Sequence, residues 1–78
     1  MPHYHFHIQE DGCLIHDEEG QDFADAASAR REAVATGAAI ARDAFTTGSA
    51  DHVIIDVRED DTPVVKVSIT LDVEQKVR

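Results

Sequence analysis

The spacing of the apolar residues changes twice along this chain, and this change constrains the fold more than any other feature of the sequence. Residues 3–9 alternate with a period of two, which is typical of a half-buried β-strand. A helical period follows over residues 26–46, and the two-residue period returns over 52–58 and 64–73. With residues 13–16 as the return strand of a first hairpin, the predicted order is β-β-α-β-β.

The first hairpin is expected to turn at Asp11-Gly12, because a tight hairpin turn needs a positive φ at both central residues. A two-residue loop pairs Ile8 with Ile15 and places His16 on the same face as the histidines of the first strand. A three-residue loop would shift the pairing by one residue and move His16 to the other face. We favour the two-residue loop, because it sets the two isoleucines opposite each other.

One helix is expected over residues 26–46, with Asp25 as its N-cap and Gly48 as its stop signal. The predicted buried stripe consists of small and apolar residues at helical spacing: Val34, Gly37, Ala38, Ile40, Ala41, Ala44 and Phe45. Because much of this stripe is alanine, the helix should approach the sheet closely.

The second hairpin takes its register from two independent matches. Apolar residues face each other when Val57 lies opposite Val65. The same register sets Asp56 opposite Lys66, an opposite-charge pair on the other face of the sheet. It leaves a loop of residues 60–62.

These elements predict one α+β domain over residues 1–78, in which a single helix covers one face of a four-stranded, mainly antiparallel sheet. We expect the first strand to lie between the second and the third, in the spatial order 2-1-3-4. The face without a helix would carry the histidines together with Leu14, Ile54, Val64 and Ser68. A chain of 78 residues with one cysteine has a small core and no internal disulfide, so self-association is an expected source of stability.

The charge argues against two classes of partner. Sixteen acidic and seven basic residues give a formal net charge of −9, which repels nucleic acid and anionic membrane surfaces. No apolar run approaches the length of a membrane span, and a lone Cys13 suits a reducing compartment, so a cytoplasmic protein is expected. Cys13 has no cation nearby, and none of the serines sits in a strand-to-helix nucleophile elbow. We therefore expect a protein that is not an enzyme.

The alternating histidines carry the most chemistry in the sequence. His3, His5 and His7 point to one face, with neighbouring Cα atoms about 6.5–7 Å apart. That spacing lets imidazoles converge on zinc or another divalent ion, with a further ligand from His16 or Glu18. The alternative, which we favour, is an exposed strand face with polar side chains. Because acidic residues lie beside them, these histidines would also gain protons at about pH 6.

Three segments stand out in combination: MPHYHFH at residues 1–7, DEEG at 17–20 and ARREA at 29–33. Together they resemble a family of small, uncharacterised alphaproteobacterial proteins, whose chains open with Met-Pro-Arg-Tyr-Phe-Phe-His and continue through a D-x-E-G segment and a helix beginning A-R-x-E-A. His7 fits that pattern, whereas His3 and His5 depart from it, so a three-histidine metal site is not a property of the family. The resemblance implies a compact ββαββ domain of unknown function.

The sequence therefore predicts a small, acidic, non-enzymatic interaction module that binds a protein partner or a second copy of itself as a homodimer. The expected contact surface is the uncovered sheet face with the acidic loops around it. The alternative is a divalent-metal-binding or pH-responsive protein that uses His3, His5, His7 and His16.

Overall fold

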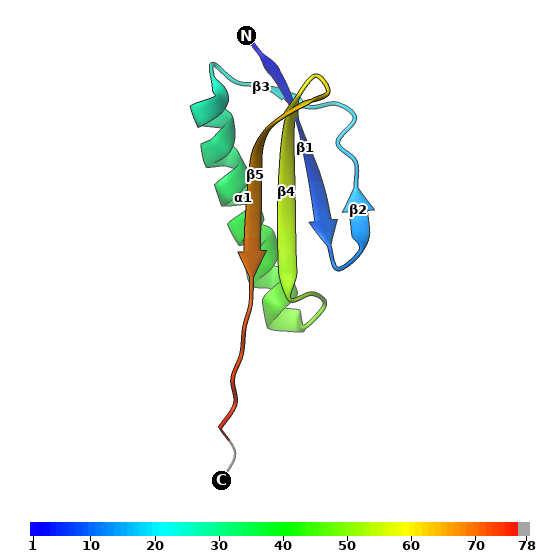
Figure 1. The fold of residues 1–78 in the computed structure, drawn as a ribbon, viewed down its shortest axis with the longest axis vertical. Helices are drawn as coiled ribbons and strands as arrows, with labels where there is room; N and C mark the ends of the chain where they lie inside the picture. Colours follow the sequence, from blue (N-terminus) through cyan, green and yellow to red (C-terminus); the bar gives the residue numbers. More distant parts are fainter. Residues whose placement is uncertain (77–78) are drawn as a thin grey trace.

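A computed structural model describes residues 1–76 and shows two layers, a sheet with one helix lying across it (Figure 1). Along the chain the elements are β1 His3–Glu10, β2 Cys13–Ile15, β3 Gln21–Asp22, α1 Ala26–Thr47, β4 His52–Glu59 and β5 Thr62–Thr70. The strands pair antiparallel. The predicted α+β class and ββαββ order are thus confirmed, with the short strand β3 as an addition.

The spatial order is β2-β1-β4-β5, with β5 at one edge, as predicted from the sequence. The added strand β3 pairs with β1 through Tyr4 and Gln21. Because Tyr4 pairs with Glu59 of β4 on its other side, β3 lies on the same edge of β1 as β2 does. That edge is therefore covered at both ends by two short segments.

The first hairpin has the predicted two-residue loop. Ile8 pairs with Ile15 and Glu10 with Cys13. Asp11 has a φ of 43° and Gly12 a φ of 84°, the positive values that a tight hairpin turn requires.

The second hairpin keeps the predicted register but not the predicted loop. Val57 pairs with Val65 and Asp56 with Lys66, as expected. The three-residue loop over 60–62 is wrong, because β5 already begins at Thr62. The odd residue is taken up instead by a bulge after Val57, where the register shifts and Arg58 pairs with Pro63.

The predicted strand over 64–73 is too long at its C-terminal end. β5 ends at Thr70, which pairs with the first residue of β4, His52. Leu71 still donates its backbone N–H to the Asp51 carbonyl at 2.8 Å, but no strand of the described residues lies beside the chain after that point. Leu71 and Val73 are therefore 38% and 72% exposed.

The helix begins and ends close to the predicted positions. The Asp25 carboxylate accepts the backbone N–H of Ser28 at 2.8 Å, and Gly48, with a φ of 80°, donates its N–H to the Ala44 carbonyl at 2.9 Å. The predicted buried stripe was wrong for Val34 and Ala38, which are exposed. The buried line follows the smallest residues, because they allow the closest approach to the sheet: Ala29, Ala33, Gly37, Ala41 and Ala44.

The core lies between α1 and the sheet. Its largest fully buried side chains are Tyr4, Val53, Ile55 and Val57. Gly37 is the point of closest approach, since a Cβ there would lie 3.1 Å from Ile69 Cδ1 and 3.2 Å from Ile55 Cγ1.

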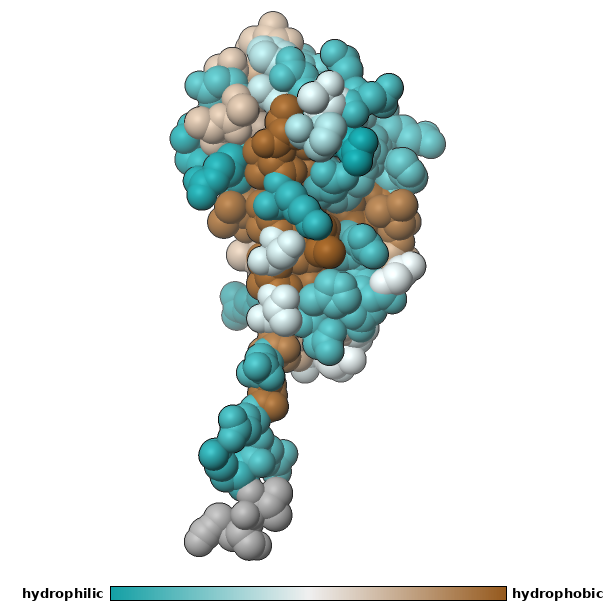
Figure 2. Space-filling model, viewed as in Figure 1, coloured by the Kyte–Doolittle hydropathy of each residue, from teal (hydrophilic) through white to brown (hydrophobic). Residues whose placement is uncertain are grey.

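No helix of the described residues covers the opposite face of the sheet, and Figure 2 shows this face with polar surface interrupting the apolar residues over β4 and β5. The register places His7 beside Asp56 and Asp56 beside Lys66 on this face. Within residues 1–76, no helix combines the length and apolarity needed to cross a membrane.

Candidate functional site

The four histidines of the predicted site lie side by side on the open face. The ring centroids of His3 and His5 are 5.1 Å apart, those of His5 and His7 are 6.3 Å apart, and those of His7 and His16 are 4.6 Å apart. Residues i and i+2 of β1 point to the same face, and the two-residue turn brings His16 across. The structure thus brings the predicted set together as a row of rings.

His3, at one end of the row, uses both ring nitrogens. Its Nδ1 lies 2.6 Å from Asp22 Oδ1 and its Nε2 lies 2.6 Å from the Glu19 carbonyl oxygen. Because both partners are acceptors, both nitrogens act as donors only when the ring is protonated. The bond to Asp22, and then the bond to Glu19, raise the pKa of His3 above its ordinary value of 6.5.

Asp17 fills the gap between β2 and β3 at the edge of β1. Its carboxylate accepts the backbone N–H of Phe6 at 3.0 Å and that of Gly20 at 2.9 Å, while its own N–H donates to His7 Nδ1 at 3.1 Å. Burial alone would raise the pKa of Asp17. The backbone donors of Phe6 and Gly20, with the nearby His5, outweigh burial and lower that pKa below its ordinary value of 3.8.

These bonds limit which histidine nitrogens are free for a metal ion. His7 accepts a hydrogen bond at Nδ1, so a neutral His7 carries its proton on Nε2. Coordination by His3 or His7 would require these bonds to break, whereas no hydrogen bond within residues 1–76 engages the ring nitrogens of His5 or His16. The zinc set of His3, His5, His7 and His16 stays a prediction, and it would need a rearranged edge of β1.

Gly20 completes the same edge. It has a φ of +73°, and a Cβ at this position would lie 2.6 Å from His3 Nε2 and 2.6 Å from the Tyr4 carbonyl oxygen. The D-x-E-G segment at 17–20 therefore has a structural explanation: Asp17 and the Glu19 carbonyl accept hydrogen bonds, and Gly20 permits the close approach.

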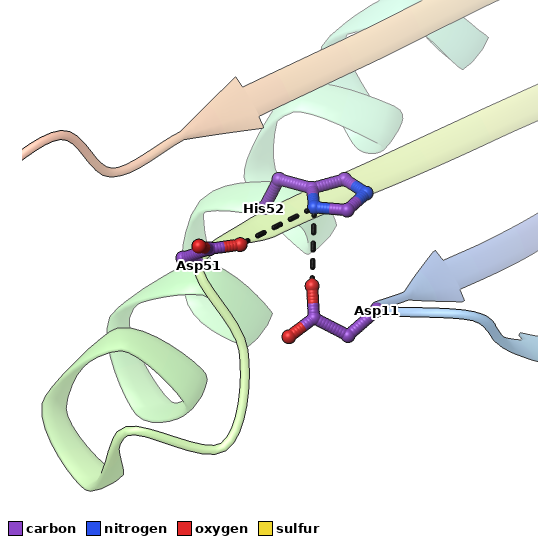
Figure 3. A group of neighbouring side chains, drawn as sticks. All are labelled: Asp11, Asp51 and His52. Carbon is purple, nitrogen blue, oxygen red and sulfur yellow. Dashed lines mark hydrogen bonds and ion pairs between the residues drawn. The ribbon is translucent and has the colours of Figure 1, made fainter.

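A second group of titratable side chains lies at the other end of the sheet (Figure 3). His52 Nδ1 lies 3.1 Å from Asp11 Oδ1 and 3.4 Å from Asp51 Oδ1. Within residues 1–76, Asp11, Asp51 and His52 form the one group of three in which a carboxylate oxygen or ring nitrogen from each residue lies within 4.8 Å of the others. A protonated His52 would form an ion pair there, and the same atoms could face a divalent cation.

Sequence reasoning missed this second group. It forms because Glu10 pairs with Val53, which sets the β1–β2 turn next to the start of β4. The strand alternation that identified β1 and β4 does not specify how two strands distant in sequence are aligned, so the register between them was the missing signal.

A shallow depression of about 360 Å³ lies in the open face next to the histidine row. Its lining combines imidazoles, an apolar side chain and a charged pair: His7, Leu14, His16, Asp56, Arg58 and Asp61. Two of these lining residues form an ion pair, with Arg58 Nε 3.0 Å from Asp56 Oδ2, so their opposite charges partly neutralise each other. Leu14 is 57% exposed beside them.

The comparisons with known proteins identify the family. A family model described as a domain of unknown function, DUF6894, matches residues 3–70. No curated protein and no solved structure matches this chain significantly. The chain belongs to the DUF6894 family, and the resemblance to a family of unknown function is thereby confirmed.

Proposed function

We propose that this DUF6894 protein is a small, acidic, non-enzymatic interaction module that binds a protein partner through the open face of its sheet. The observation that carries the proposal is the uncovered face with its depression beside the histidine row. Apolar side chains surrounded by polar groups are typical of protein-binding surfaces. Here Leu14 and Val64 are exposed, and Ile54 lies half-buried between the polar residues of β4.

The charge around this face selects the kind of partner. The acidic segment over residues 17–22 borders the histidine row, and the whole chain has a formal charge of −9. A basic protein surface would be attracted to this side and would neutralise the segment on binding. We place the interaction in the cytoplasm, as expected from the single cysteine.

Affinity capture with the full chain tests this proposal. Wild-type protein, Leu14→Asp and the matched control Ala39→Asp, on the exposed side of α1, would each be used as bait in an extract of the host. We expect a basic protein that is retained by the wild type and the control, lost with Leu14→Asp, and released by added salt. Capture that Leu14→Asp does not reduce, or no specific capture, would contradict the proposal.

A second candidate function follows from His3. Because this ring joins β1 to the segment before α1 through Asp22 and Glu19, its deprotonation would loosen that connection. The protein would then respond to pH at the edge of β1, next to the proposed binding face. The related possibility of a zinc site uses the same row of rings.

Zinc titration calorimetry separates these uses of the histidines. If the row binds zinc, His5→Ala/His7→Ala should lose binding, while His52→Ala, in the separate group at the other end of the sheet, should retain it. Binding that only His52→Ala abolishes would assign zinc to the second group instead. Binding that neither variant changes would exclude the histidine row as a zinc site.

A further inference from the structure

No strand of residues 1–76 pairs with the outer edge of β5, which leaves its backbone groups open. β5 is the last strand in the sheet order, and Leu71 directs its N–H toward Asp51 on the β4 side. Backbone groups of alternate residues point to opposite sides of an antiparallel strand. The N–H and C=O groups of Lys66, Ser68 and Thr70 therefore point away from β4, toward the free edge.

We propose that two copies of this chain form a symmetric dimer by pairing β5 antiparallel with β5, with the two-fold axis at Ile69. The pairing would join the two sheets into one continuous sheet with both helices on the same side. It goes beyond the proposed binding of a protein partner, because it uses the sheet edge and leaves the open face free.

The sequence of β5 and the residues after it is complementary to itself around Ile69. In the proposed register, Val65 faces Val73 of the second copy and Val67 faces Leu71 on the helix side of the sheet. On the open side, Lys66 faces Asp72 and Ser68 faces Thr70 of the second copy, each twice by symmetry. Apolar pairs thus lie on the covered face, and an opposite-charge pair lies on the polar face.

Registers shifted toward the start of β5 lack this match, whereas an axis at Thr70 would pair Lys66 with Glu74 and Val67 with Val73. A two-fold axis at Val67 sets Lys66 against Ser68 and Glu74 against Asp60 of the second copy, which places like charges together. An axis at Lys66 sets two lysines against each other. The axis at Ile69 keeps Val65 opposite an apolar residue, Val73, whereas the axis at Thr70 sets Val65 against Gln75.

The dimer also explains the residues that follow β5. The chain continues in line with β5 and away from the domain (Figure 1), and apolar surface reappears along it (Figure 2). The alternation of Val65, Val67 and Ile69 continues through Leu71 and Val73, although β4 ends its pairing at Thr70. In one copy Leu71 and Val73 face solvent, whereas in the dimer they lie beside β5 of the second copy.

The helix has an exposed apolar flank directed toward the same edge. α1 packs on β4 and β5, and Gly37 faces the sheet. At 3.6 residues per turn, Val34 and Ala38 lie about 60–100° around the helix from Gly37 on one side, and Ala29 lies about 80° on the other. Ala29 is fully buried and Val34 is 45% exposed, so the Val34 flank faces the free edge of β5.

The dimensions bring these flanks together in the dimer. Strands in a sheet are about 4.8 Å apart, so two helices that each lie between β4 and β5 would be about 10 Å apart across the axis. This is within the usual distance of about 8–10 Å for packed helices. Gly37, at the middle of α1, lies over Ile69, so the helix midpoints would meet near the two-fold axis with Val34 and Ala38 between them.

Sedimentation velocity over a concentration series tests the dimer. We expect the wild type to dimerise and Leu71→Asp/Val73→Asp to raise the dissociation constant by about a hundredfold or more, because each carboxylate would be buried at the interface. Both residues are exposed in one copy, so the variant should fold, which circular dichroism checks. The control Leu14→Asp, on the open face, should dimerise as the wild type does. A monomeric wild type, or a dimer that Leu71→Asp/Val73→Asp leaves intact, would overturn the proposal.

Cross-linking tests the register. In a Cys13→Ser background, an oxidised mixture of Ser68→Cys and Thr70→Cys chains should form a disulfide-linked dimer, since these positions face each other around Ile69. A mixture of Lys66→Cys and Thr70→Cys chains should not. Cross-linking in the second mixture, or of Thr70→Cys chains alone, would overturn the axis at Ile69.

The two proposals fail separately. Leu14→Asp is expected to abolish partner capture and to leave the dimer intact, whereas Leu71→Asp/Val73→Asp is expected to abolish the dimer and to leave the open face unchanged. Loss of capture without loss of the dimer would therefore contradict neither the edge pairing nor its register.

Discussion

The two edges of this sheet are treated in opposite ways. The outer edge of β1 is covered by β2 at one end and β3 at the other, and the Asp17 carboxylate bonds to Phe6 between them. The outer edge of β5 is nine residues long, and no strand of residues 1–76 pairs with it. Natural proteins usually protect such edges, and here Pro63 and the adjacent bulge protect only the start.

This difference indicates a structural role for residues 13–22, which contain the acidic segment. Residues 13–22 supply hydrogen-bond partners to the outer edge of β1, through two short strands and the Asp17 carboxylate. Most residues of this segment are exposed to solvent. Within residues 1–76, no segment covers the outer edge of β5 in this way. The edge that the chain covers itself has a structural role, and the edge that it leaves free is available to a second copy.

The largest expected effect comes from Gly20→Ala, which breaks the covered edge. The new Cβ would meet His3 Nε2 and the Tyr4 carbonyl oxygen at 2.6 Å in a left-handed backbone conformation. We expect the free energy of unfolding to fall by about 3 kcal/mol or more, measured by urea denaturation. The control Gly12→Ala has a similar positive φ but open space around it and should cost about 1 kcal/mol. Equal costs would show that the close approach at Gly20 does not matter.

Asp17→Ala should have the next largest effect. It leaves the N–H groups of Phe6 and Gly20 without their acceptor, which is expected to cost about 2 kcal/mol, whereas its exposed neighbour Glu18→Ala should change stability by less than about 0.5 kcal/mol. Because the folded-state pKa of Asp17 is lowered, its contribution is present above pH 3.8 and is lost as the pH falls through that pKa. Urea denaturation of all three proteins at neutral and acid pH checks this, and a difference that persists at low pH would contradict it.

Truncation next to the free edge of β5 should affect dimerisation more than the stability of a single copy. Ending the chain after Thr70 removes the bond from Leu71 to Asp51 and should lower the stability of dilute protein by no more than about 1 kcal/mol. At high concentration the truncated chain should lose the rise of Tm with concentration that a dimer confers. Thermal denaturation at several concentrations measures both effects. A truncated chain whose Tm still rises with concentration would contradict pairing through the tail.

The smallest effect is expected from Asp22→Asn, which removes the carboxylate that holds His3. The folded-state pKa of His3 is raised above 6.5, so its contribution is complete below that value and is lost as the pH rises through the raised pKa. The Tm of Asp22→Asn should therefore fall below that of the wild type at acid pH and approach it at alkaline pH. Nuclear magnetic resonance titration of the His3 ring checks the cause. A His3 pKa that Asp22→Asn does not lower would contradict it.

Much of the fold was readable from local pattern. The turn at Asp11-Gly12 and the register of Val57 with Val65 follow from residues close in sequence. The buried residues of the helix could not be predicted from hydropathy, because Val34 is more apolar than Ala33 and yet Ala33 is buried and Val34 is exposed. The distance between α1 and the sheet, rather than hydropathy, decides which residue fits.

The candidate site also has one part that was predictable from local pattern and one part that was not. The row of His3, His5 and His7 on one face was predictable from the period of two, and His16 from the turn. The bonds from His3 to Asp22 and to the Glu19 carbonyl were not predictable, because they depend on the pairing of the short strand β3 with β1, which the sequence did not reveal.

The sequence by itself determined the helix, the strands of the two hairpins, their order and the two hairpin registers, because alternation, turn residues and helix caps act over a few residues. The short strand β3 was not among them. Only the tertiary structure decided the register of β1 with β4, which forms the group of Asp11, Asp51 and His52. It also decided that β5 stops at Thr70, since a strand needs a neighbour and β4 begins at His52. The apolar alternation beyond Thr70 was present in the sequence, and within residues 1–76 the structure leaves Leu71 and Val73 exposed, with no strand beside them.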